Sequence, residues 1–134
     1  MVKTEFEYLN KLLVILDACT ADMILNLSSI WGEEDYDATK NIKAFKIKPF
    51  LDSDRDRNII INKVYKKEVI KILAEYFDDG DYYHFKINSR EKLISLGYDN
   101  CVINFLHPEF FKLTEEHFKI MNDSKIVFTE NIED

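Results

Sequence analysis

The sequence of 134 residues has little glycine and little proline, with three Gly and two Pro. Linkers and low-complexity segments are rich in these residues, so we expect a single domain over residues 1–134. The chain also lacks the Gly-rich loop that holds phosphate groups and the GxSxG turn that presents a catalytic serine. These absences remove several common classes of enzyme site.

Cysteine is equally scarce, because Cys19 and Cys101 are the only two and each lies in an apolar run outside any CxxC pair. Two cysteines cannot form a disulfide framework, so we expect two buried thiols in a reducing compartment. The longest apolar runs, such as LLVIL, are far too short to span a bilayer, and charged residues precede the first of them. We therefore expect a soluble cytoplasmic protein without a membrane segment.

The net charge is −7, and 46% of the residues are hydrophobic. This composition predicts a packed acidic domain, ending in a loose acidic tail over residues 130–134. The negative charge opposes binding to nucleic acid and attracts a basic partner. One basic segment surrounds Phe45, but strand alternation would put Phe45 opposite Lys46 and Lys48, unlike a base-stacking strand. We therefore expect no direct contact with nucleic acid.

The spacing of apolar residues predicts an α+β fold with a mainly antiparallel sheet of about five strands and helices packed on one face. From Phe6 to Ile30 the apolar residues follow helical spacing, which predicts a long N-terminal helix, or a helix pair broken near Thr20. Later helices are expected at 64–77 and 113–123, the second capped by Thr114, with one helical turn from Ser89 to Gly97. The expected strands are 41–48, 58–62, 82–88, 100–106 and 125–130.

The stretch LDSDRDRN, residues 51–58, resembles a calcium-binding loop in part. Asp52, Asp54 and Asp56 match loop positions 1, 3 and 5, which carry oxygen ligands. Arg57, however, occupies the position that requires glycine, and Lys63 replaces the glutamate that binds the ion with both oxygens. We interpret the stretch as a solvated connector without a metal.

The histidines give the other candidate chemistry. His84, His107 and His117 are the only three, and no HExxH pattern is present. A small metal-dependent enzyme using these histidines and Glu109 stays open as an alternative. Our prediction is a protein that is not an enzyme, with no catalytic residues, no metal and no cofactor.

Two acidic clusters contain tyrosine, EEDYD and DDGDYYHF. Tyrosine is enriched in protein interfaces, and carboxylates beside it suit a basic partner, whereas a solvated turn remains the alternative interpretation. The residues expected to bind the partner are Glu33, Glu34, Asp35, Tyr36, Asp37, Asp78, Asp79, Asp81 and Tyr82.

The sequence therefore predicts a small acidic protein that inhibits a basic enzyme by binding it. Such a protein would be of the immunity-protein type, filling the active site of a nuclease toxin with its carboxylates. A non-inhibitory adaptor or a homo-oligomer subunit is the second hypothesis. The abundance of Ile, Lys, Asn and Asp suggests an AT-rich bacterial or phage genome.

Overall fold

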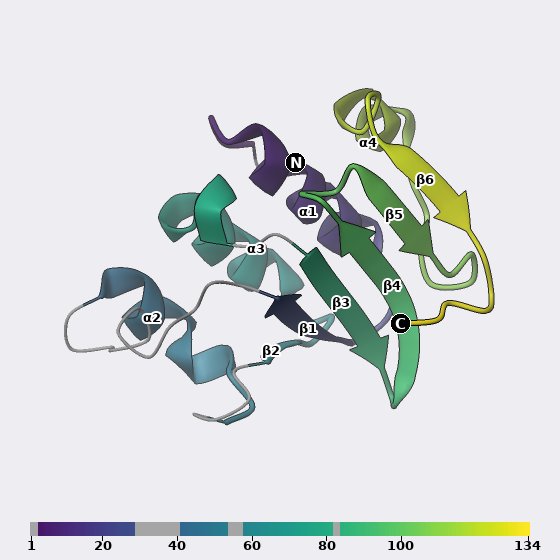
Figure 1. Ribbon diagram of the computed structural model, residues 1–134. Coiled ribbons are helices and arrows are strands. Elements are labelled where there is room, and N and C mark those ends of the chain that lie inside the picture. Colours follow the sequence, from purple (N-terminus) through teal and green to yellow (C-terminus); the bar gives the residue numbers. More distant parts are fainter. Residues whose placement is uncertain (1–2, 29–40, 54–57, 82–83) are drawn as a thin grey trace.

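A six-stranded sheet with the order β2-β1-β3-β4-β5-β6 forms the centre of the protein. The computed structural model describes residues 3–28, 41–53, 58–81 and 84–134 (Figure 1). Four of the neighbouring strand pairs are antiparallel and β5 and β6 are parallel, so the fold is α+β with a mainly antiparallel sheet, as predicted. The strands are β1 (Met23–Ser28), β2 (Ile59–Ile61), β3 (His84–Ser89), β4 (Lys92–Tyr98), β5 (Ile103–Leu106) and β6 (Lys125–Phe128).

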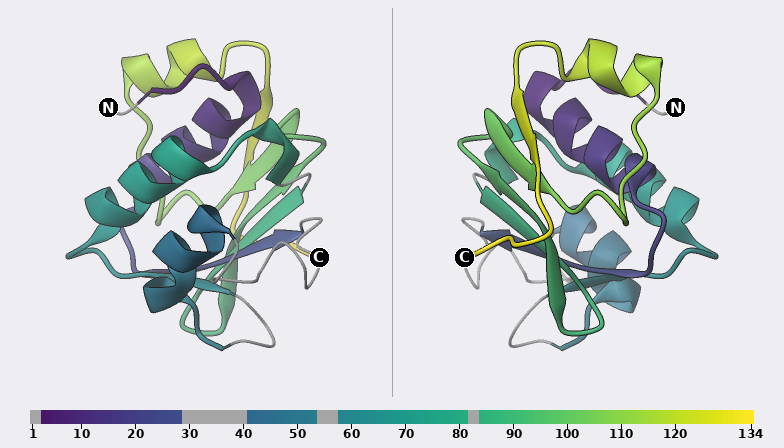
Figure 2. Two further views of the ribbon diagram at one scale, coloured as in Figure 1. Left: turned by 90° about the vertical axis from the view of Figure 1, so that its left-hand side faces the viewer. Right: turned by 90° about the vertical axis from the view of Figure 1, so that its right-hand side faces the viewer.

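Helices cover one face of this sheet (Figure 2). Helix α1 (Glu7–Ala18) buries five consecutive apolar residues from Leu12 to Leu16, so it is enclosed on nearly all sides. Cys19 and Cys101 are both buried thiols, as expected. Among the described residues, no helix is long and apolar enough to cross a membrane. The helices are α1 (Glu7–Ala18), α2 (Ile42–Ile47), α3 (Lys66–Tyr76) and α4 (Glu115–Ile120), with 3-10 helices η1 (Lys48–Phe50) and η2 (Asp79–Asp81).

The C-terminal tail lies on the other side of the sheet from the helices (Figure 2). Its last residue, Asp134, forms an ion pair with Lys86 of β3, with 2.7 Å between Nζ and Oδ2. Phe85 and Ile87 of the same strand point into the core, so Lys86 belongs to the outer face. The tail that the sequence predicted as loose thus ends in a contact with the sheet.

The predicted long N-terminal helix is wrong in its second half. Helix α1 has 12 residues and ends at Ala18, and the next segment pairs with both β2 and β3 as strand β1. Met23 and Leu25 are buried while Ile24 is 36% exposed, which is the alternation of a strand. Backbone bonds between residues 18–20 and 110–112 turn the chain away from the helix axis. Long-range pairing therefore overrides the local helical spacing.

The strand predicted over residues 41–48 is also wrong, because residues 42–47 form helix α2. The side chain of Asn41 caps it by accepting a hydrogen bond from the N–H of Lys43 at 2.9 Å. Ala44 and Ile47 are buried at helical spacing, whereas Phe45 is 56% exposed. A segment of only six residues can match both the strand period of two and the helical period of about 3.6, so the alternation did not distinguish the two structures.

The helical turn predicted from residues 89 to 97 is a hairpin instead. Strands β3 and β4 pair from Ser89 and Lys92, so Arg90 and Glu91 form a two-residue turn. Gly97 then lies opposite Phe85, and a Cβ there would lie 2.0 Å from Phe85 Cε1. The other predicted helices and strands are present with shifted ends, including α4 with Thr114 as its N-cap.

Candidate partner-binding surface

The acidic turn between α3 and β3 uses its carboxylates inside the protein. Asp79 Oδ1 accepts a hydrogen bond from the N–H of Leu9 at 2.7 Å. Asp81 Oδ2 accepts from the N–H of Asp78 at 2.7 Å, and Asp78 Oδ1 accepts from the N–H of Gly80 at 2.8 Å. These bonds fix the shape of η2, and of these three aspartates Asp78 is the exposed one.

Asp79 has the further effect of capping α1. Phe6 is the N-cap residue of that helix and offers no side-chain acceptor. The amide of Leu9 is one of the N-terminal amides that lack a partner within the helix, and a carboxylate near it is favoured by the helix dipole. An acidic residue predicted to bind a partner therefore also stabilises the first helix.

Helix α2 is attached to this acidic turn and to the end of α3 through its basic residues. Lys43 Nζ forms an ion pair with Asp81, and both side chains are mostly buried. The same ammonium lies 5.2 Å from the ring centre of Phe77, and Lys46 Nζ lies 5.7 Å from that of Tyr76. The cations of α2 thus face inward, where they contact aromatic rings and a carboxylate.

Two of the four apolar residues of α2 face outward, whereas Ala44 and Ile47 are buried. Ile42 is 57% exposed and Phe45 56% exposed, and their spacing puts them on one side of the helix. Figure 1 shows α2 at the margin of the domain, beside α3. Asp78 is exposed in the adjacent turn. We call Ile42, Phe45 and Asp78 the α2–η2 surface.

The remaining predicted partner-binding residues lie outside the described residues: Glu33, Glu34, Asp35, Tyr36, Asp37 and Tyr82. In the sequence, the cluster 33–37 precedes α2 and Tyr82 follows η2 directly. The structure therefore brings Asp78, Asp79 and Asp81 together in one turn and joins that turn to α2. Sequence analysis missed Ile42 and Phe45, although Asn41 as a helix cap would have put them on one face.

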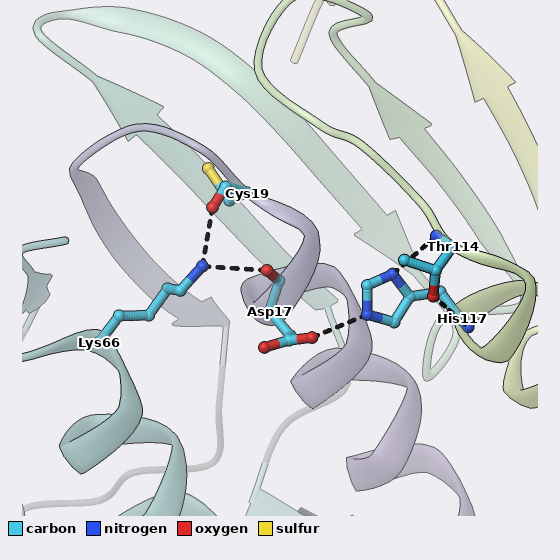
Figure 3. A network of polar contacts seen from close by, with 5 residues as sticks. All are labelled: Asp17, Cys19, Lys66, Thr114 and His117. Carbon is cyan, nitrogen blue, oxygen red and sulfur yellow. Dashed lines mark hydrogen bonds and ion pairs between the residues drawn. The ribbon is translucent and has the colours of Figure 1, made fainter. Parts of the chain in front are cut away.

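A network of polar contacts around Asp17 joins α1, α3 and α4 and includes His117 (Figure 3). Its Nδ1 accepts a hydrogen bond from the N–H of Thr114 at 3.1 Å, and its Nε2 lies 2.7 Å from Asp17 Oδ2. An acceptor Nδ1 assigns the proton of the neutral ring to Nε2, which then donates to the carboxylate. Lys66 at the start of α3 donates to the carbonyl groups of Asp17 and Cys19, both at 2.9 Å. One ring nitrogen of His117 thus holds the N-cap of α4, and the other joins α4 to α1.

The other two histidines also accept hydrogen bonds from backbone amides at Nδ1. His84 accepts from the N–H of Asp99, and His107 from the N–H of Glu109, both at 3.2 Å. His107 is 1% exposed. Within residues 3–28, 41–53, 58–81 and 84–134, no three His, Cys, Asp or Glu side chains gather closely enough to hold a metal ion.

Cys19 and Asp52 both make contacts within the protein. Burial raises the pKa of the Cys19 thiol, against the smaller opposing effects of its contact with Ala21 and of Lys66. The thiol is therefore protonated at neutral pH and a poor nucleophile. The two oxygens of Asp52 accept from the amide and the side chain of Asn58, both at 3.0 Å. Asp52 closes the loop, while Asp54 and Asp56 lie outside the described residues.

Comparisons with protein families, curated proteins and solved structures found no match for this chain.

Proposed function

We propose that the protein binds a basic protein partner through the α2–η2 surface and the neighbouring acidic residues, and thereby inhibits it. The observation that carries this proposal is the exposure of two apolar residues on one side of α2. Its lysines contact Asp81, Phe77 and Tyr76, whereas Ile42 and Phe45 face solvent. Exposed apolar residues that gather beside polar ones are typical of interaction sites.

The apolar pair would supply the anchor of the interface. Burying one such side chain contributes about 1.5–3 kcal/mol, and aromatic residues are frequent among those that dominate binding energy. Phe45 is the larger of the two and lies in a short helix whose first turn is held by Asn41 and by the ion pair of Lys43. The backbone around Phe45 would therefore lose little conformational freedom on binding.

The charge of the partner follows from the surroundings of that pair. Asp78 is exposed in the turn whose Asp81 pairs with Lys43 of α2, and the chain as a whole carries a net charge of −7. A positive surface would be attracted over a distance and oriented on arrival, which raises the association rate. An enzyme that binds phosphate groups has such a surface at its active site, so binding there would exclude the substrate.

The setting we propose is that of an immunity-type protein acting on a toxin nuclease in a bacterial or phage-infected cytoplasm. The three histidines support a role in binding over one in catalysis, because each uses Nδ1 to hold a turn or helix cap. The buried thiols are compatible with a reducing compartment.

The experiment has two stages. The tagged protein is used to capture partners from host lysate at low and moderate salt, and each captured basic enzyme is then purified and assayed with it. We expect stoichiometric inhibition, and association that slows as salt rises. Phe45→Ala should weaken binding at least tenfold, and Asp78→Asn should mainly slow association.

Phe118→Ala is the matched control, since Phe118 is 46% exposed on α4 and distant in sequence from the proposed surface. Equal affinities for the wild type, Phe45→Ala and Asp78→Asn would reject this surface. Capture of an acidic partner, or of one whose activity is unchanged on binding, would reject inhibition of a basic enzyme.

The same apolar pair also favours a second candidate, a homo-oligomer that buries Ile42 and Phe45 between copies. Light scattering after size exclusion separates the two. A wild-type oligomer that becomes a monomer on Phe45→Ala would support the homo-oligomer and oppose the inhibitor.

A further inference from the structure

A cavity of about 460 Å³ lies at the end of the sheet where β3 turns into β4. This volume is in the range of small-molecule sites, which is roughly 300–1,000 Å³. Four segments that are distant in the sequence form its walls, so tertiary structure alone creates it. The residues that line it are Thr20, Ala21, Asp22, Lys63, Ser89, Arg90, Lys92, Glu109 and Phe110.

Three cations converge on this cavity. Lys63 comes from the turn before α3, Arg90 from the hairpin turn and Lys92 from the start of β4. None of the three forms an ion pair with any residue that the structure describes, in contrast to Lys11 and Lys86, which each bind a carboxylate. Unpaired cations from three elements are therefore available to one anion.

The two carboxylates at the cavity cancel only part of this charge. Asp22 Oδ1 accepts a hydrogen bond from the N–H of Lys63 at 2.8 Å and so holds the turn that carries Lys63. With Glu109 included, the lining residues have a formal charge of +1, in a chain whose net charge is −7. The cavity is thus a locally positive region of an acidic protein.

The turn that positions Arg90 has an unfavourable backbone conformation. Arg90 has φ 48° and Glu91 has φ 66°, in the left-handed region that usually holds glycine, asparagine or aspartate. Arg90 and Glu91 have Cβ atoms and no short polar side chain, so this conformation costs energy. Such local strain is found most often where a side chain serves a function.

An aromatic ring lies beside the cations. Phe110 lines the cavity, and Lys92 Nζ lies 5.9 Å from the centre of its ring. The cavity is larger than a phosphate ion needs, so it has room for an attached organic group against this ring. A guanidinium and two ammonium groups are the partners that phosphate oxygens favour in proteins.

From this arrangement we propose that the cavity binds a small phosphomonoester whose organic part is a planar ring. Arg90, Lys63 and Lys92 hold the phosphate, and Phe110 contacts the ring. The site shares no residue with the α2–η2 surface, so this inference goes beyond the proposed function. A negative result for the cavity would leave the proposed function untouched.

The test is an NMR titration of the whole ¹⁵N-labelled protein with phenyl phosphate at low ionic strength. We expect saturable shifts at residues 20–22, 63, 89–92 and 109–110. Inorganic phosphate should bind several-fold more weakly, and phenol should give no saturable shift. The variant Arg90→Gln/Lys92→Gln should weaken the binding of phenyl phosphate at least tenfold.

Lys67→Gln/Lys119→Gln is the control, because it removes the same charge from exposed sites that the cavity does not include. The control should bind phenyl phosphate as the wild type does. The proposal is overturned if shifts do not saturate, if they lie at other residues, or if both double variants lose affinity equally. All four substitutions are of exposed side chains, and the amide spectrum of each variant shows directly whether it is folded.

Discussion

Asp79 Oδ1 lies 2.7 Å from the amide nitrogen of Leu9, a contact across 70 residues of sequence. The bond joins the acidic turn after α3 to the first turn of α1. Asp79, which the sequence predicted to bind a partner, therefore has a structural role. Experiments on partner binding should therefore substitute Asp78, because a substitution of Asp79 changes the stability of the protein as well as its surface charge.

Asp79→Ala should lower the free energy of unfolding by about 1 kcal/mol, the usual effect of removing an acceptor at a helix N-terminus. Asp79→Asn should lose less, because its amide oxygen still accepts from Leu9. Urea denaturation measures both, with Glu75→Ala, an exposed residue on α3, as the control. Equal stability of Asp79→Ala and the wild type would show that the cap does not contribute.

The Asp17–His117 contact should behave as a coupled pair. A double-mutant cycle with Asp17→Asn and His117→Ala should give a coupling of about 1 kcal/mol, since His117 is buried although Asp17 is partly exposed. The exposed pair Lys71–Glu75, at 4.0 Å, is the comparison and should give less than about 0.5 kcal/mol. Similar values for the two pairs would contradict a structural role for His117.

Gly97→Ala should strongly destabilise the folded protein. The new Cβ would meet the ring of Phe85 far inside contact distance, so the free energy of unfolding should fall by about 3 kcal/mol. Adding Phe85→Leu should recover part of that loss, because the smaller side chain makes room. A double variant less stable than Gly97→Ala alone would show that the clash is not the cause.

Glu91→Gly should stabilise the protein by about 0.5–1 kcal/mol, because relief of the left-handed strain exceeds the added entropy of the unfolded chain. Glu75→Gly in the exposed face of α3 should have the opposite sign, a loss of about 1 kcal/mol. Thermal unfolding measures both. A loss of stability in Glu91→Gly would remove the argument that the hairpin turn is strained.

Asp123 should make stability depend on pH in the acid range. The hydrogen bond from Lys11 Nζ, at 2.7 Å, holds the pKa of the Asp123 carboxyl below its ordinary value. A folded-state pKa below the unfolded one gives a contribution that is complete above the unfolded pKa, about 3.9, and is lost as pH falls through the folded pKa. Asp123→Asn should flatten the stability curve there, and an unchanged slope would count against the pair.

Local sequence predicted those elements whose patterns fit one structure only. Thr114 followed by two glutamates predicted the start of α4, and the apolar run 59–61 predicted β2. The segment from Met23 to Ser28 could not be predicted in this way, because its apolar positions suit a helix and a strand alike. Pairing with Ile61 and Ile87, both distant in the sequence, decided that it is a strand.

The sequence by itself determined an acidic α+β domain, because charge and apolar periodicity are properties of the residues and of their neighbours. Only the tertiary structure decided that Asp79 caps α1, that the lysines of α2 face inward, and that Arg90 meets Lys63 at one cavity. Each of these contacts joins residues far apart in the chain. Their geometry depends on how the helices and strands pack together, which no local pattern contains.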